Sequence, residues 1–401
     1  MMGAGAPIDV EAWSTSGDLE LSHDQIVVIE RSGLAEVIAG SAPETFRVRT
    51  GSTIGVLVSE DLELRVSPHL AVSSLMFLLG YAADPTGWRH SVAGFEDEDD
   101  LFVAIANAFS WHATWALDRG VLRGYIHRDE RDVHLRGRIR FGDQVARSAG
   151  LPLPVEISYD DFTEDVLENQ MLRTAASLLM RLPRVPQEAR KRLARLRSVL
   201  AEVSELRVGT DVRVPGITRL NHRYSAALVL AGLVLRGASL RDERGTVDAT
   251  TFMFDMNRVF EDFVTVALRE ELEQFGGELR SQVTEVALSQ HIRVKPDLAW
   301  WRDSGWRAII DAKYKPLFGE SFPNGDAYQM LAYTLAYQLD RGWLIYARTP
   351  QQHSLVHTIP TAGKEIAVRA LDVRRAPDDL LADVAELARE ILASVPTLKA
   401  A

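Results

Sequence analysis

The sequence contains no cysteine among its 401 residues. Disulfide bonds are therefore excluded, and so are zinc and iron–sulfur sites that depend on thiolate ligands. No apolar run approaches the length of a membrane span, and the longest candidate covers only Ala226–Leu235. The first residues, MMGAGAPIDVEAW, lack the basic segment and apolar run of a signal peptide. We therefore expect a cytoplasmic protein with no membrane contact.

Positive charge is also scarce. The chain has 45 Lys and Arg residues against 56 Asp and Glu residues, a formal net charge of −11. Tight non-specific binding to DNA depends on neutralising phosphates, so this balance argues against a free-standing binder of that kind. A subunit that is brought to DNA by a partner escapes the objection. A G-x-x-x-x-G-K-[ST] loop is missing as well, so we do not expect the chain itself to bind GTP.

The pattern of the sequence divides it into three regions. Residues 1–86 are rich in short strands, residues 87–250 are mainly helical with one basic hairpin, and residues 251–401 alternate helices and strands. A hydrophobic content of 46% with 25% charged residues is ordinary for a globular protein of two or three domains. The predicted fold class is α/β with several domains.

Short strands predict a small barrel or sandwich in the first region. They are expected at Ile26–Glu30, Thr45–Arg49, Thr53–Ser59 and Leu62–Ser67. In the second region, Leu122–Phe141 is basic and reads as a hairpin. Arg136, Arg138 and Arg140 would alternate onto one face of its second strand, where they could contact DNA phosphates. A solvated strand face without that function explains the same pattern equally well. Helices are expected at Thr163–Met180, with Thr163 as N-cap, and at Gln187–Leu206.

The stretch Val294–Lys315 concentrates the chemistry of the third region. It predicts two short strands joined by a turn at Asp303–Ser304–Gly305. Because strand side chains alternate, Asp311 and Lys313 should project to one side, with Asp297 on the neighbouring strand. Two carboxylates and a lysine suit Mg²⁺-assisted hydrolysis of a phosphodiester, since hard oxygen ligands hold the ion. The alternative is a plain Asp–Lys ion pair on a solvated sheet.

Two predicted helices flank these strands. In Phe254–Phe275 a polar row includes Glu261, which could lean over the sheet as a third acidic group. In Asp326–Leu339, Gln329 and Tyr333 lie one turn apart on one face. The alternative for Gln329 is a capping box with Asp326. The expected order of elements is helix, three strands, helix, strand.

The Pro-Asp, spacer, Asp-x-Lys pattern resembles the PD-(D/E)XK nuclease superfamily, and the Gln-x-x-x-Tyr pair resembles its RecB-like branch. Further stretches are similar to the McrC family, the nuclease subunit of McrBC-type restriction systems that attack modified DNA. The similarity keeps its order from about residue 44 to residue 348. It is carried by SSLMFLLGYA from Ser73, GVLRGYIHRDE and LRGRIRF within Gly120–Phe141, DDFTEDVLEN from Asp160, RLNHRYSAALVLAGLVL from Arg219, FMFDMNRVFEDFV from Phe252, KPDL, IIDAKYK and DAYQMLAY.

This resemblance implies a Mg²⁺-dependent endonuclease, with Mn²⁺ as a possible substitute metal. It implies metal ligands at Asp297, Asp311 and Glu261, and further catalytic residues at Lys313, Gln329 and Tyr333. It also implies a partner, a hexameric McrB-like AAA+ GTPase that the N-terminal domain contacts and stimulates, and a substrate of modified double-stranded DNA. Two other functions are considered: a non-catalytic activator or scaffold of an NTPase motor, and a stand-alone RecB-like nuclease. The intact acidic residues favour the endonuclease subunit, because clustered charges are costly to keep without a use.

Overall fold

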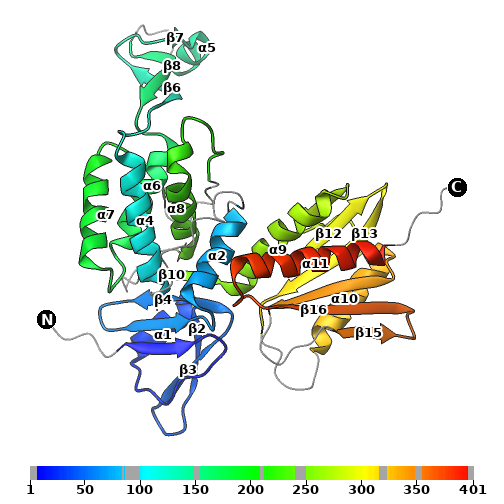
Figure 1. Ribbon diagram of the computed structural model, residues 1–401. Helices are drawn as coiled ribbons and strands as arrows, with labels where there is room; N and C mark the ends of the chain where they lie inside the picture. Colours follow the sequence, from blue (N-terminus) through cyan, green and yellow to red (C-terminus); the bar gives the residue numbers. More distant parts are fainter. Residues whose placement is uncertain are drawn as a thin grey trace. The chain divides into compact units, whose positions relative to one another are not determined.

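The computed structural model of the chain describes residues 7–83, 85, 100–148, 153–207, 212, 214–239, 250–315, 323–347 and 355–395 (Figure 1). The chain divides into two compact units. Unit 1 combines residues 1–101 with residues 241–401, and unit 2 spans residues 102–240. Among the described residues, no helix is both long enough and apolar enough to cross a membrane. Both units mix helices and strands, which confirms the predicted α/β class.

An open sheet forms the N-terminal part of unit 1. Its strands β1 (Ile8–Glu11), β5 (Glu63–Ser67), β4 (Thr53–Val58) and β10 (Thr250–Asp255) lie side by side in this order. The first pair is parallel and the other two pairs are antiparallel. A separate hairpin pairs β2 (Ala35–Ala39) with β3 (Phe46–Thr50). The expected boundary between residues 250 and 251 falls inside β10, and the one between residues 86 and 87 lies outside the described residues.

The strand predicted at Ile26–Glu30 is wrong, because these residues lie in helix α1 (His23–Ser32). Ser22 and Gln25 form a capping box at the start of the helix, and Gly33 closes its end in the left-handed conformation, with φ of 72°. Both signals stabilise a helix at its ends. They outweigh the β propensity of the Ile-Val-Val-Ile run, which is weak and depends on context.

The two sequence segments of unit 1 share one core. Strand β10 passes directly into helix α9 (Met256–Glu273), whose N-cap Asp255 accepts a hydrogen bond from the backbone of Asn257. Helix α2 (Val72–Ala83) packs on α9. The rings of Phe77 and Tyr81 lie 5.9 and 5.6 Å from that of Phe263. The segment before residue 101 is therefore packed into the same unit as the segment after residue 241.

A six-stranded sheet forms the C-terminal part of unit 1, in the order β11-β12-β13-β14-β16-β15. The neighbours β13, β14 and β16 are parallel, and the other pairs are antiparallel. The strands are β11 (Glu278–Ser281), β12 (Leu298–Arg302), β13 (Gly305–Lys313), β14 (Arg341–Ala347), β15 (Leu355–Ile359) and β16 (Lys364–Leu371). Helices α9 and α11 (Pro377–Ser394) lie together on one face, and α10 (Asn324–Tyr337) packs on the other (Figure 1). The expected order of helix, three strands, helix and strand is confirmed.

Unit 2 consists of helices with a small sheet that extends away from them (Figure 1). The helices are α4 (Leu101–Leu117), α6 (Leu167–Leu179), α7 (Gln187–Val199), α8 (Ser225–Gly237) and the short η1 (His222–Tyr224). The sheet has the strand order β6-β8-β7, with β6 at Gly124–Asp132, β7 at Arg138–Ile139 and β8 at Val155–Thr163. Helix α5 (Phe141–Ser148) lies between β7 and β8 in the chain, and α6 follows β8.

Two sequence predictions for unit 2 are wrong. The hairpin expected at Leu122–Phe141 does not form, because β6 and β7 each pair with β8 rather than with each other. Thr163 ends β8 and is not an N-cap, since α6 begins at Leu167 after Val166. The nine paired positions of β6 and β8 join residues about 30 apart in sequence, and local alternation carries no information about such a distant partner.

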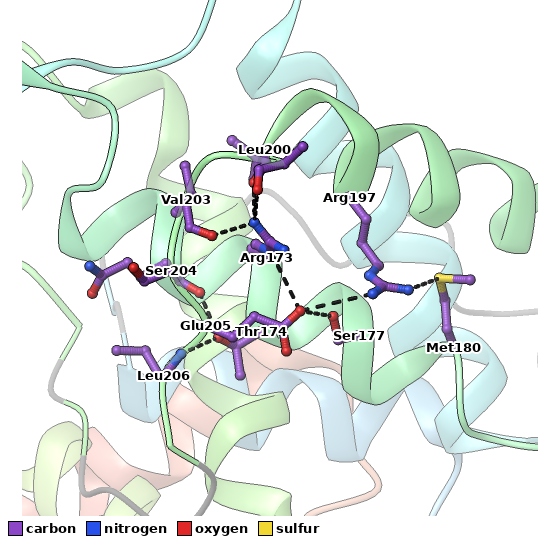
Figure 2. A network of polar contacts seen from close by, with 12 residues as sticks. Arg173, Thr174, Ser177, Met180, Arg197, Leu200, Val203, Ser204, Glu205 and Leu206 are labelled. Atoms are coloured by element: carbon purple, nitrogen blue, oxygen red, sulfur yellow. Dashed lines mark hydrogen bonds and ion pairs between the residues drawn. The ribbon is translucent and has the colours of Figure 1, made fainter.

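Helix α7 ends at Val199, earlier than predicted. The chain that follows is hydrogen-bonded to Arg173 of α6 (Figure 2). The Nη1 of Arg173 donates to the carbonyls of Leu200, at 2.8 Å, and of Val203. Glu205 accepts from Ser177 Oγ at 2.7 Å, and the backbone of the following residue donates to Thr174. Carbonyls at a helix end need donors, and a charged side chain is a strong one. The network therefore fixes the end of α7 against α6.

Candidate active site

Asp311 and Lys313 lie near the end of β13 with their side chains in contact. The Nζ of Lys313 is 2.6 Å from Oδ2 of Asp311. Asp311 is only 1% exposed, so the predicted alternative of a pair on a solvated sheet is wrong. The ammonium of Lys313 thus contacts Oδ2 and favours the charged form of Asp311, although Oδ2 accepts no hydrogen bond of good geometry. A carboxylate oxygen has more than one lone pair, so Oδ2 can bind a further ligand beside the Lys313 ammonium.

Asp297 precedes β12 and is held against β13. Its Oδ2 accepts a hydrogen bond of 2.9 Å from the backbone N–H of Ala312, the residue between Asp311 and Lys313. Burial, together with the charge of Asp297, raises the pKa of Asp311 to about 7, although Lys313 opposes the shift. The two carboxylates therefore share one poorly solvated region, as the alternation of the sequence predicts.

Glu261 of α9 reaches the same region through Gln282. The Nε2 of Gln282 donates to Oε1 of Glu261 and, at 3.4 Å, to Oδ1 of Asp297. Burial raises the pKa of Glu261, and the charge of Asp297 adds to the effect. Sequence reasoning missed Gln282, because it lies in the connection between β11 and β12, where neither spacing nor periodicity marks a residue.

The donor set fits a small divalent cation held by two carboxylates. Across the described ranges, no three His, Cys, Asp or Glu side chains are grouped closely enough to hold a metal ion. Mg²⁺ does not need three, because it keeps several waters and binds one or two carboxylates together with substrate phosphate. Asp297 and Asp311 supply these, and such an ion would bind the Asp311 carboxylate beside the Lys313 ammonium. Glu261, tied to Gln282, would act through water.

The pair Gln329 and Tyr333 on α10 supports the segment that carries Asp297. Gln329 donates to the Tyr333 hydroxyl at 2.9 Å, and this hydroxyl donates to the carbonyl of Lys295 at 3.0 Å. The alternative capping box with Asp326 is wrong, because the N-cap of α10 is Pro323 and no side chain caps the helix. The chain of two hydrogen bonds ends two residues before Asp297, so it fixes the backbone that presents this carboxylate.

A second polar network, missed from the sequence, lies beside the first. Asp326 at the start of α10 is 8% exposed and accepts from Lys315 Nζ at 2.9 Å and from the Tyr346 hydroxyl at 2.5 Å. Burial and the bond to Asp326 raise the pKa of Tyr346, which therefore stays protonated as a donor. In the sequence, only the second lysine of D-A-K-Y-K, Lys315, indicated this network. The network fastens α10 to β14 and to the end of β13.

The arginines of the predicted phosphate-contacting face belong to unit 2 and not to this site. Arg138 lies on β7 and is exposed, as is Arg136. Arg140 forms ion pairs with Asp143 and, at 3.5 Å, with Asp129. Two neighbouring carboxylates offset its charge, so Arg140 is the least available of the three for a phosphate. A role of these residues in DNA binding stays a prediction.

The raised pKa of Asp311 predicts that stability without metal falls as pH rises. Between its ordinary value of 3.8 and about 7, the folded state binds a proton that the unfolded state releases. The contribution of this proton to the free energy of unfolding is fully present below pH 3.8 and is lost as pH rises through about 7. In EDTA, the free energy of unfolding should drop by about 1–3 kcal/mol between about pH 5 and pH 8. Asp311→Asn should reduce the drop, and calorimetry that finds equal drops would contradict the prediction.

Comparison with known proteins agrees with the sequence motifs. The family model described as McrBC 5-methylcytosine restriction system component matches residues 48–347, and the chain belongs to this family. Among solved structures, a chain of the Thermococcus gammatolerans assembly of McrB AAA+ hexamers with bound McrC aligns with a TM-score of 0.61 and 16% identity. The alignment covers 96% of this chain and 100% of that one, and it shows a common fold. The predicted resemblance to the McrC family is confirmed.

Two further solved structures match less well. The cryo-EM structure of the Thermococcus gammatolerans McrBC complex gives a TM-score of 0.39 and 15% identity, over 67% of this chain and 88% of that chain. The crystal structure of protein VC1899 from Vibrio cholerae gives 0.28 and 13%, over 82% of this chain and 58% of that chain. No curated protein matches the chain.

Proposed function

We propose that this chain is the Mg²⁺-dependent DNA endonuclease subunit of a McrBC-like restriction system that cleaves modified DNA. The observation that carries the proposal is the buried carboxylate of Asp311, which contacts the Lys313 ammonium and shares a poorly solvated region with Asp297. Membership of the restriction-component family supports the same function. Cleavage that needs both a divalent cation and the Asp311 carboxylate is the experimental test.

Each side chain of the site has a role in this proposal. Asp297 and Asp311 would hold the ion, which when bound polarises a phosphate and acidifies a water. Burial works against the charged form of Lys313, but Asp311 and Asp297 outweigh it and raise the pKa of the ammonium. Lys313 therefore stays protonated at neutral pH. It would stabilise developing negative charge or orient the water, and it is not suited to act as a general base.

The partner and the substrate follow from the family. The Thermococcus gammatolerans structure contains McrB AAA+ hexamers with bound McrC. We propose that this chain likewise binds a hexameric McrB-like AAA+ GTPase, through residues 1–86, and raises its GTPase rate. The motor would supply most of the DNA affinity, because a chain with net charge −11 binds DNA phosphates only weakly. The substrate would be double-stranded DNA that carries a modified base.

A non-catalytic scaffold would have no use for the buried carboxylate of Asp311. Its ionised form is disfavoured, as the pKa of about 7 indicates, and an apolar residue would fill the same place without that cost. Retention of this group beside Asp297 and Lys313 therefore favours catalysis. The stand-alone nuclease is disfavoured by the family match, which covers both units.

Gln329→Ala should give a graded loss of activity. The substitution removes the donor to Tyr333, whose bond to Lys295 steadies the backbone before Asp297. Loss of such support typically costs about 10- to 100-fold in metal affinity or activity. Gln329 is exposed, so the melting temperature should change little. Tyr328→Ala, at the exposed neighbouring position, is the matched control. A lower melting temperature with unchanged turnover would show that Gln329 has a structural role only.

A further inference from the structure

A short hairpin connects β11 to β12 immediately before Asp297, and we name residues 282–296 the site hairpin. The backbone N–H of Leu288 donates to the carbonyl of Ile292 at 2.8 Å near its tip, and Ala287 forms an isolated bridge with Arg293. Val283 and Val294 are 6% and 4% exposed and belong to the core that α10 covers. The hairpin is therefore anchored by packing at its base, while the residues at its tip are exposed.

Three contacts hold the base of the site hairpin against the carboxylates. The backbone N–H of Gln282 donates to the carbonyl of Asp297 at 2.8 Å. Its side chain bridges Glu261 and Asp297, and the Tyr333 hydroxyl donates to the carbonyl of Lys295. Any group that the hairpin carries near its base thus has a fixed position relative to the site.

Burial alternates along the arm that leads into Asp297. Arg293 and Lys295 are exposed, Val294 and Pro296 are buried, and Asp297 is half-buried. Alternation with period two is that of an extended chain, in which every second side chain points to the same side. Arg293 and Lys295 therefore share one side, about 6.6 Å apart along the chain, and Lys295 lies two residues before Asp297.

Among the described residues, the two cations on this side have no acidic partner. In the part of the chain that the structure describes, no carboxylate lies within ion-pair distance of Arg293 or Lys295. Arg293 makes one weak contact, from Nη1 to the carbonyl of Thr284 at 3.4 Å. The lysines of the site are occupied, because Lys313 pairs with Asp311 and Lys315 pairs with Asp326. Unpaired cations beside a group of carboxylates are notable in a chain of net charge −11.

We propose that Arg293 and Lys295 form a phosphate-binding strip that guides the DNA backbone to Asp297. This inference rests on the proposed nuclease function and assigns the substrate contact nearest the site. Asp297, Asp311 and Glu261 repel a phosphate, so positive charge must lie next to them if DNA is to approach. The strip supplies it two and four residues before Asp297, on an arm that the Tyr333 hydroxyl holds at Lys295. Phosphate contacts position the backbone without reading the sequence, so the strip does not select the modified base.

Salt dependence of DNA binding tests the strip directly. The full chain is mixed with a fluorescent DNA duplex in EDTA, and anisotropy is followed from low to physiological salt. Each phosphate that a cation contacts adds about 0.9 to the slope of log K against log salt. Arg293→Gln and Lys295→Gln should each reduce the slope by about 0.9 and weaken binding at every salt concentration. The control is Arg389→Gln on α11, an exposed arginine whose removal changes net charge by the same amount.

Slopes that equal the wild-type slope would overturn the proposal, as would an equal reduction in Arg389→Gln. A wild-type chain that does not bind the duplex even at low salt would also overturn it. Failure of the nuclease function has a different signature. If the slopes change as expected but no metal-dependent cleavage occurs with any partner motor, the strip stands and the nuclease function fails. If wild type cleaves and both variants keep their KM for DNA, the strip alone fails.

Discussion

Asp311→Ala is expected to abolish DNA cleavage while leaving the fold intact. The substitution removes the buried Asp311 carboxylate, which is one of the two carboxylates that would bind a divalent cation. A catalytic metal stabilises the transition state by several kcal/mol, and each 1.36 kcal/mol is a factor of ten in rate. The loss should therefore be about 1000-fold or more. The measurement is cleavage of modified DNA by the chain with its GTPase, GTP and Mg²⁺.

Two comparisons make this experiment specific. Asp340→Ala removes an aspartate whose side chain is 87% exposed, and it should cleave at the wild-type rate. Chelation of the metal should stop cleavage by the wild-type chain and should not change the residual cleavage by Asp311→Ala. The variant should still raise the GTPase rate of the motor, because its folded surface elsewhere is unchanged. Cleavage by Asp311→Ala at the wild-type rate in Mg²⁺ would contradict the assignment of the site.

Deleting residues 1–84 is expected to unfold unit 1 and not simply to detach a docking domain. The deletion removes β4, which pairs with all six residues of β10, and α2, which packs on α9 through Phe77 and Tyr81. Loss of these buried rings alone costs about 3–5 kcal/mol each, a large part of the stability of a domain. The truncated chain should melt without a sharp transition and should lack both cleavage and GTPase stimulation.

The control for this deletion is a chain in which a flexible linker replaces residues 102–240. Unit 1 keeps both of its segments and its core, so this variant should melt cooperatively. A truncated chain lacking residues 1–84 that melts sharply would contradict the shared core. If it also stimulates the motor normally, the proposed docking by residues 1–86 is wrong. Point substitutions on the N-terminal sheet are the appropriate probe of docking, because they leave the core in place.

The sequence predicted the carboxylates and lysine of the site because their geometry is local. Asp311 and Lys313 lie two residues apart on one strand, and a short turn joins β13 to the strand that Asp297 precedes. Alternation along a strand then suffices to place them on one side. Helix α9 was predicted for the same reason, since its apolar residues recur at a period close to 3.6.

Residues that act through distant contacts could not be predicted. Gln282 touches Glu261, 21 positions away, only because β11 returns along the sheet. Strand β10 pairs with β4 across about 195 positions, and nothing in either segment identifies the other. The mistaken strand at Ile26–Glu30 had a different cause, because its helix depends on capping by Ser22 and Gln25, just outside the apolar run.

The direct passage from β10 into α9 joins the N-terminal sheet to the site by one stiff element. Asp255 ends the strand and caps the helix, and its side chain also bonds Ser52 of the sheet at 3.0 Å. Glu261 lies five residues into the helix, about one and a half turns from the sheet. We expect this element to couple binding at the sheet to metal binding at the site. If a partner on the sheet tightens metal binding by some factor, bound metal must tighten the partner's binding by the same factor.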